Sequence, residues 1–192
     1  MKRRKFLSAC GVTTAAFASL VVVSRESGPA KRVSLVSTDD SPAKYDLSLS
    51  AEVVRKTITS SHTAKLRITI TNKSDQELKM SDGSRQVFSQ TASVDAEPGI
   101  RLFEQGAEPI SVPGSWKPLN EQARSMELEF TRVPPKERKS IDLKVWGEPG
   151  ISVDHGISTG MFRFSTTYHV FENGNEEQFD WGFTLSIEKI ES

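Results

Sequence analysis

From Tyr45 to the end of the chain, apolar residues recur at every second position, and this period constrains the fold more than any other feature. The first such segment carries Tyr45, Leu47, Leu49, Ala51 and Val53, with polar residues between them. Successive side chains of a β-strand point to opposite faces of the sheet. The alternation therefore predicts strands that bury one face and expose the other.

The same alternation returns in later segments. They carry Leu66, Ile68 and Ile70; Met126, Leu128 and Phe130; Ile141, Leu143 and Val145; Phe162, Phe164, Tyr168 and Val170; and Phe179, Trp181, Phe183, Leu185 and Ile187. No segment of a dozen residues has a helical period, so helices cannot cover the buried face of a single sheet. The pattern predicts an all-β fold, an antiparallel β-sandwich of about seven to nine strands.

Turn-forming residues separate these segments. The pair Asn173-Gly174 suits a tight hairpin, so we expect the last two strands to pair with each other. Prolines in the range 88–120 exclude central strands, and we expect edge strands and long loops there. Trp116 lies in this range and has two interpretations, a loop residue that covers the edge of the core or an exposed contact residue.

The N-terminal run Arg3-Arg4-Lys5-Phe6-Leu7 is followed by an uncharged stretch from Ser8 to Ser24. Paired arginines before a short apolar segment are typical of a twin-arginine export signal, with Arg3, Arg4, Phe6 and Leu7 as its recognised residues. Serine, glycine and threonine dilute this segment, so an export signal fits better than a membrane span. We therefore expect an exported protein that is secreted or anchored at the cell surface.

The fate of this signal has two alternatives. Cleavage after Ala16-Phe17-Ala18 would release the chain, whereas retention would leave an N-terminal anchor. Cys10, the only cysteine, ends a lipoprotein-like pattern and is a candidate for lipidation. If the signal is removed after Ala18, the mature chain has no disulfide, no thiol nucleophile and no cysteine metal ligand.

The sequence divides into three regions. Residues 1–24 form the signal or anchor, residues 25–44 a flexible tether, and residues 45–192 the β-sandwich domain. The tether is rich in serine, aspartate, proline and lysine, which cannot bury enough apolar area to order the segment. Its short run Val33-Ser34-Leu35-Val36 is the one part that fits an edge strand.

Charge narrows the class of partner. The chain has 25 basic and 25 acidic residues, but four of the basic ones lie in the range 2–5, so the exported part is mildly acidic. Nucleic acid is excluded as a partner, because phosphate binding needs clustered lysine and arginine. Membrane contact is expected only through a retained N-terminal segment. The expected partner is an unidentified protein or cell-envelope component.

No catalytic motif is present: the sequence has no G-x-S-x-G elbow, no H-E-x-x-H and no glycine-rich phosphate loop. His62, His155 and His169 lie in three separate segments. A metal site from Asp154, His155 and His169 is one interpretation, and a solvated loop histidine at position 155 is the preferred one. We predict that the chain is not an enzyme and carries no metal and no other cofactor.

The run Asn72-Lys73-Ser74 is an N-x-S sequon at a predicted strand end. Asn72 is therefore a candidate for glycosylation in an exported protein, or alternatively a turn former.

Three phrases in order resemble immunoglobulin-like domains of exported microbial proteins. They are Thr69-Ile70-Thr71-Asn72, then Val133-Pro134-Pro135-Lys136-Glu137, then Gly160-Met161-Phe162-Arg163-Phe164. The resemblance covers roughly Tyr45 to Ile190, and the N-terminal signal further resembles those of haloarchaeal secreted proteins. It implies an immunoglobulin-like sandwich and transfers no functional residue.

The function expected from these observations is that of a non-catalytic cell-surface binding or accessory module. Two alternatives stay open, an inhibitor or regulator of a secreted hydrolase and a carrier of a small ligand or metal. The expected working surfaces are the proline-rich middle loops and the loop from Gly147 to Gly160.

Overall fold

The computed structural model describes residues 29–82, 87–88, 90–94, 96–111, 115–119, 129–149, 154–172 and 175–191. The export residues Arg3, Arg4, Phe6 and Leu7 and the lipidation candidate Cys10 lie outside these residues. The strands are β1 (Lys31–Thr38), β2 (Leu47–Arg55), β3 (Thr57–Ile58), β4 (Lys65–Asn72), β5 (Leu78–Ser81), β6 (Gln90–Ala92), β7 (Ile100–Glu104), β8 (Thr131–Val133), β9 (Arg138–Gly147), β10 (Gly160–Glu172) and β11 (Asn175–Lys189). A 3₁₀ turn, η1 (Asp154–Gly156), precedes β10.

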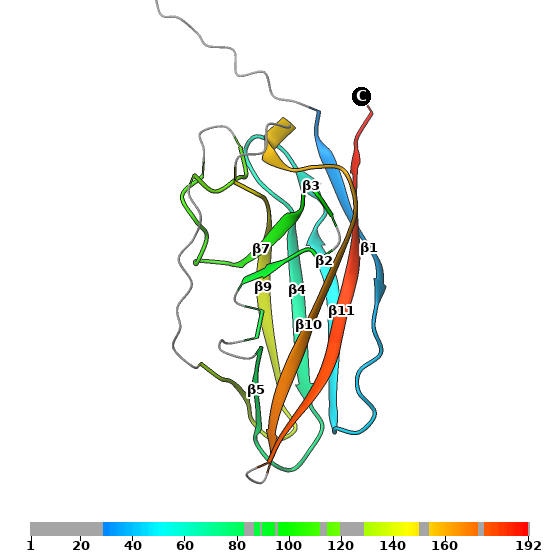
Figure 1. Cartoon of the computed structure of the whole chain (residues 1–192), viewed down its shortest axis with the longest axis vertical. Helices are drawn as coiled ribbons and strands as arrows, with labels where there is room; N and C mark the ends of the chain where they lie inside the picture. Colours follow the sequence, from blue (N-terminus) through cyan, green and yellow to red (C-terminus); the bar gives the residue numbers. More distant parts are fainter. Residues whose placement is uncertain are drawn as a thin grey trace, which may run out of the picture.

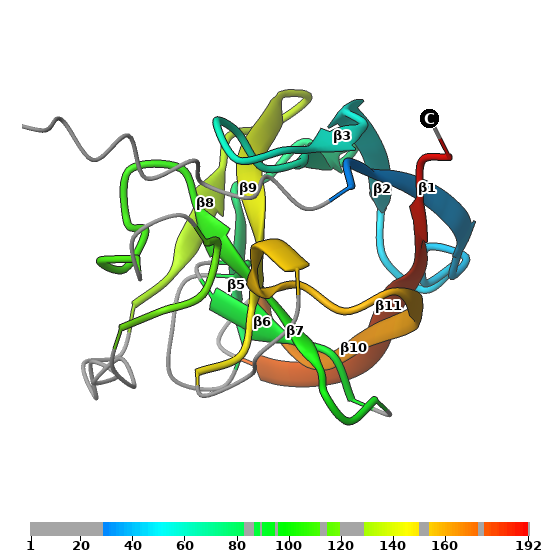
Figure 2. The ribbon, with the colours of Figure 1, turned by 90° about the horizontal axis from the view of Figure 1, so that it is seen from above.

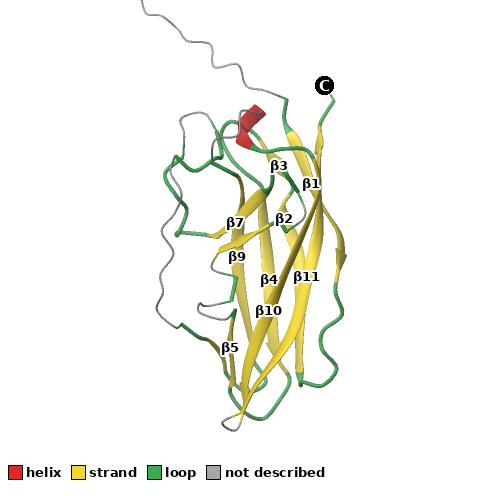
Figure 3. Ribbon diagram, viewed as in Figure 1, coloured by secondary structure: helices red, strands yellow, loops and turns green. Residues whose placement is uncertain are grey.

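The strands form two antiparallel sheets, which confirms the predicted all-β sandwich (Figures 1 and 3). The six-stranded sheet has the order β3-β1-β11-β10-β5-β8, and the five-stranded sheet has the order β2-β4-β9-β7-β6. The described residues contain 11 strands, more than expected, because β3, β6 and β8 are too short to show an alternation. No helix with the length and apolar character of a membrane span occurs in this described part of the chain.

The predicted alternation places one face of each long strand in a shared core. Leu66, Ile68 and Ile70 of β4 are fully buried, as are the inward residues Leu143 and Val145 of β9. On the other sheet the two longest strands add buried aromatic residues to the aliphatic ones: Phe162, Phe164 and Tyr168 of β10, and Trp181 and Phe183 of β11. In Figure 2, β9 and β11 lie on opposite sides of the interior that these side chains fill.

The prediction of a tether is wrong for the segment that forms β1. This strand pairs with β11 from Lys31↔Lys189 to Thr38↔Phe183, and the side chain of Val33 is fully buried. It lies inside the six-stranded sheet, between β11 and the two-residue strand β3. Without β1, the backbone N–H and C=O groups along this edge of the long β11 would have no strand partner. Pairing with β1 supplies their hydrogen bonds within the sheet.

The middle and end of the chain follow the sequence analysis in part. β6 is an edge strand as expected, but β7 lies inside its sheet, between β9 and β6. β10 and β11 pair over their whole length, from Gly160↔Ile187 to Glu172↔Asn175, as expected. Residues 173–174 lie outside the described residues, and so do Met126 and Leu128. Phe130, the last residue of that predicted strand, precedes β8 and is not in a strand.

A cluster of charges joins β4 and β9 on the outer face of the five-stranded sheet. The carboxylate of Asp142 on β9 accepts hydrogen bonds from the Nε of Arg67 at 2.8 Å and from its Nη2 at 3.2 Å. The ammonium group of Lys65 lies 2.6 Å from the same carboxylate. The hydrogen bond from Arg67, then the bond and charge of Lys65, lower the pKa of Asp142 to about 2, against the effect of partial burial.

We predict that Asp142→Asn lowers the free energy of unfolding at pH 7 by about 1–2 kcal/mol. The folded-state pKa lies below the usual value of 3.8, so the carboxylate stabilises the fold above about pH 4. This contribution is lost as the pH falls toward 2, where the difference between variant and wild type should disappear. Urea unfolding at pH 7, 4 and 2 measures it.

Glu52→Gln is the matched control for this experiment. The Glu52 carboxylate is exposed and lies 3.9 Å from Arg67, so its removal should change the stability by less than about 0.5 kcal/mol. A constant effect of Asp142→Asn at all three pH values would contradict the assignment.

Candidate functional site

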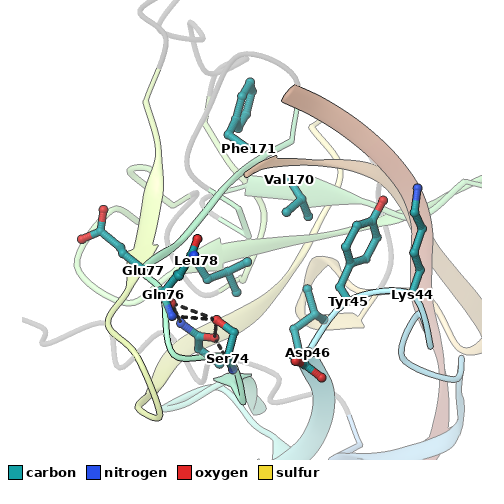
Figure 4. Close-up of a pocket in the computed structure, with 11 residues that line it drawn as sticks. Lys44, Tyr45, Asp46, Ser74, Gln76, Glu77, Leu78, Val170 and Phe171 are labelled. Atoms are coloured by element: carbon teal, nitrogen blue, oxygen red, sulfur yellow. Dashed lines mark hydrogen bonds between the residues drawn. The ribbon is translucent and has the colours of Figure 1, made fainter. Parts of the chain in front are cut away.

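A pocket opens at one end of the sandwich, where four segments of the chain meet (Figure 4). Its volume is about 170 Å³, which is below the size of a typical drug-sized site and suits one compact chemical group. The lining residues come from the start of β2, the turn after β4, the start of β5 and the end of β10. They are Lys44, Tyr45, Asp46, Leu47, Asn72, Ser74, Gln76, Glu77, Leu78, Val170 and Phe171.

One wall of the pocket is fixed by a bond between distant segments. The hydroxyl of Tyr45 donates a hydrogen bond to Oε2 of Glu177 on β11 at 2.7 Å, and the ammonium group of Lys44 lies 2.5 Å from the same oxygen. Lys44 and then Tyr45 lower the pKa of Glu177. Tyr45 also packs against Phe179, with ring centroids 5.6 Å apart. The ring of Tyr45 is therefore held in place by contacts to β11.

The floor of the pocket is organised by Asn72, which is 1% exposed. Its Nδ2 donates to the carbonyl oxygens of Gln76 at 2.7 Å, Val133 at 3.0 Å and Pro134 at 3.1 Å. Its Oδ1 accepts hydrogen bonds from the backbone N–H of Ser74 at 3.0 Å and from the Ser74 hydroxyl at 2.8 Å.

This network supports the turn-former interpretation of Asn72. Glycosylation requires an amide nitrogen that an enzyme can reach, and in the folded protein this nitrogen is buried and fully bonded. Asn72 joins the turn after β4 to the turn before β9, and the intact mass of the recovered protein tests whether it is glycosylated.

The remaining lining combines apolar walls with charged rims. Leu47, Leu78 and Val170 are buried and form the apolar part. Glu77 is exposed at the rim, and its carboxylate accepts a hydrogen bond from Arg132 at 2.6 Å.

Phe171, at the rim of the pocket, belongs to a second cluster. Its ring centroid lies 5.1 Å from that of Phe130, in a T-shaped arrangement. The ammonium group of Lys79 sits 3.7 Å from the Phe130 centroid and 5.4 Å from the Phe171 centroid. These contacts hold Phe171 at the mouth of the pocket through cation–π attraction.

The histidines do not converge. His155 lies in η1, before β10 begins, and His169 lies near the far end of β10, about 30 Å along the strand from its first residue, Gly160. The ring of His169 pairs with Glu176 at 2.5 Å. No cluster of three or more histidine, cysteine or acidic side chains suited to a metal ion occurs in the described ranges. The metal site considered from Asp154, His155 and His169 is therefore not assembled.

The expectation of a solvated histidine at position 155 is wrong, because His155 is 7% exposed. Its carbonyl oxygen accepts a hydrogen bond from the backbone N–H of Trp116 at 2.8 Å, and the Trp116 carbonyl accepts from Gly147 N–H at 2.8 Å. The two loops expected as working surfaces are thus joined to each other, at the end of the sandwich opposite the pocket (Figure 1).

Trp116 is the residue that joins them. Its indole nitrogen donates to the Thr59 carbonyl at 2.6 Å, and its ring meets Trp146 edge-on with centroids 5.8 Å apart. It packs partly buried against the core, which confirms the first of its two interpretations. Beside it, Ile110 and Leu119 are largely exposed on a loop closed by a hydrogen bond between their backbones.

No pattern in the sequence predicts the pocket. Its walls come from residues 44–47, 72–78 and 170–171, which no periodic pattern connects. Only Asn72, which the sequence offered as a turn former, marked part of it. Comparison with protein-family models, with curated proteins and with solved structures finds no match to this chain.

We predict that Asn72→Ala lowers the free energy of unfolding by roughly 2–3 kcal/mol, since it leaves buried carbonyls and the Ser74 N–H without their partner. Denaturant unfolding measures the loss. The control Asn175→Ala removes an exposed asparagine and should change the stability by less than about 0.5 kcal/mol. Equal stability of the two variants would rule out the network as the organiser of the pocket floor.

Proposed function

We propose that this chain is an exported, non-catalytic binding module with an immunoglobulin-like sandwich, and that its end pocket takes a compact polar unit of a cell-envelope polymer. The pocket carries the proposal, because segments distant in sequence build a site of about 170 Å³ with both apolar and polar walls. A few polar groups within a partly apolar lining are typical of ligand sites.

The polar side chains of the pocket are held by hydrogen bonds within the protein, which favours ligand binding over catalysis. Asn72 and Ser74 are engaged in hydrogen bonds that shape the pocket, and Glu177 holds Tyr45 in place. Side chains fixed in this way lose little conformational entropy when a ligand binds. Ordering them therefore costs little of the binding free energy. The arrangement suits recognition of a fixed shape.

Export is proposed from the sequence. The paired arginines, the short apolar segment behind them and the mildly acidic remainder fit a protein that works outside the cytoplasm. A twin-arginine route carries proteins that fold before crossing. Such a protein would reach the envelope with its pocket already formed.

The binding proposal is tested with insoluble cell-envelope material from the host in a sedimentation assay. Wild-type protein should co-sediment with the material in a saturable manner. Gln76→Trp places a large ring at the exposed rim of the pocket and should reduce binding at least tenfold. Gln105→Trp alters an exposed glutamine that does not line the pocket and should bind as wild type. Equal binding by both variants would exclude the pocket as the site.

Export is tested by the N-terminus and intact mass of the protein recovered from the native envelope and medium. We expect a species that begins near Ser19, or a membrane-bound species with the signal retained or with lipid on Cys10. Its mass should show no glycan on Asn72, because that amide is buried in the fold. Recovery of the full-length chain from the cytoplasm alone would refute the proposal of export.

A further inference from the structure

Two buried N–H donors of the five-stranded sheet have no hydrogen-bond acceptor among the residues that the structure describes. They are the Nε of Arg101 on β7 and the indole Nε1 of Trp146 on β9. Trp146 is 3% exposed, whereas Arg101 is only partly buried. A buried donor without an acceptor costs free energy, and the cost is larger for a charged group. Two such donors in one place indicate a site that an acceptor from outside the chain completes.

The two donors belong to neighbouring side chains. Arg101 and Trp146 are direct partners in the antiparallel pairing of β7 with β9 (Figure 1). Side chains that are directly opposite in such a pair extend on the same face of the sheet. The adjacent residues Leu102 and Val145 are fully buried in the core, so Arg101 and Trp146 extend on the outer face.

The surroundings of the pair supply no side-chain acceptor at this register. The ring of Trp146 meets Phe103 and Trp116 edge-on, with centroids 5.9 Å and 5.8 Å away. On its other side, Arg101 pairs with Ala92 of the edge strand β6, whose methyl group cannot accept a hydrogen bond. Ring packing therefore positions the indole, and its N–H group stays unbonded within the described part of the chain.

The positive charge of Arg101 is also uncompensated, since no ion pair joins it to an acidic side chain in the described ranges. Acidic side chains beside this part of the sheet are held by other partners. The carboxylate of Glu148 accepts a hydrogen bond from the backbone N–H of Gly99 at 3.1 Å. Glu108 pairs with the ammonium group of Lys144. An anion at this place would therefore meet a guanidinium group that is not already neutralised.

We infer that Arg101 and Trp146 form a carboxylate-binding site, in which the bound anion accepts hydrogen bonds from both N–H groups. A carboxylate has two acceptor oxygens and can serve two adjacent donors at once. It also supplies the negative charge that the guanidinium lacks, and charge-assisted hydrogen bonds are about twice as strong as neutral ones. The site lies beside Trp116, at the end of the sandwich opposite the pocket, so this inference does not rest on the proposed function.

The test is ¹H–¹⁵N NMR of the indole groups of the three tryptophans during a titration with acetate. The indoles of Trp116 and Trp181 already donate to the carbonyl oxygens of Thr59 at 2.6 Å and Asp39 at 3.0 Å. We expect acetate to shift the Trp146 indole signal downfield in a saturable manner, because a new acceptor deshields the proton. Acetamide has the same planar shape without the charge and should bind roughly tenfold more weakly.

Two variants and a control separate the two donors from general charge. Trp146→Phe keeps an aromatic ring against Phe103 and Trp116 but removes the indole N–H, so the responding signal should disappear and acetate should bind more weakly. Arg101→Gln removes the charge and should weaken acetate binding by roughly tenfold or more. Arg138→Gln neutralises an exposed arginine at the start of β9 and should bind acetate as wild type does.

Three results would each overturn the inference. They are a Trp146 indole signal that does not move with acetate, equal binding of acetate and acetamide, and unchanged acetate binding in folded Arg101→Gln. Thermal unfolding shows whether each variant is folded. The first two results come from the wild-type protein alone, so the inference stays testable if a variant does not fold.

Discussion

The whole structure depends on the contact between the two inner faces of the sandwich, where the aromatic residues of β10 and β11 meet the aliphatic residues of the other sheet. The rings of Phe164 and Phe183 stack with centroids 5.1 Å apart, and Trp181 lies 5.8 Å from Phe183. The aliphatic side chains of β4 and β9 pack into the same core. A sheet with one apolar face is stable only if that face is covered, so each sheet requires the other. Both ends of the sandwich are positioned by this contact.

Different kinds of interaction hold the loops and turns together at the two ends of the sandwich. At one end, Trp116 joins two loops over the edge of the core through ring packing and backbone hydrogen bonds. At the other end, Asn72 and the pair of Tyr45 with Glu177 hold turns and strands together through polar groups. Aromatic packing fills the end at Trp116, whereas the hydrogen bonds at the other end leave space for the pocket. The proposed function follows from this difference.

The pairing is irregular in β1, which the two-residue strand β3 covers only at its start, and in the edge strand β2. The register of β1 with β11 shifts between Leu35 and Ser37, and that of β2 with β4 shifts between Val53 and Arg55. The hydroxyl of Ser41 accepts a hydrogen bond from the backbone N–H of Leu49 at 2.8 Å on the open side of β2. Bulges and capped edges discourage pairing with another chain.

The sequence by itself determined the architecture, because a period of two in residues such as Leu66, Ile68 and Ile70 allows one face to be buried and no helix to form. It also determined the pairing of β10 with β11, through the turn signal between them. Only the tertiary structure decided that Lys31–Thr38 is a strand, that His155 is buried and that Asn72 organises a floor. Each of these depends on a partner far along the chain. Local patterns record which face of a strand is apolar, but not which distant backbone or side chain will meet it.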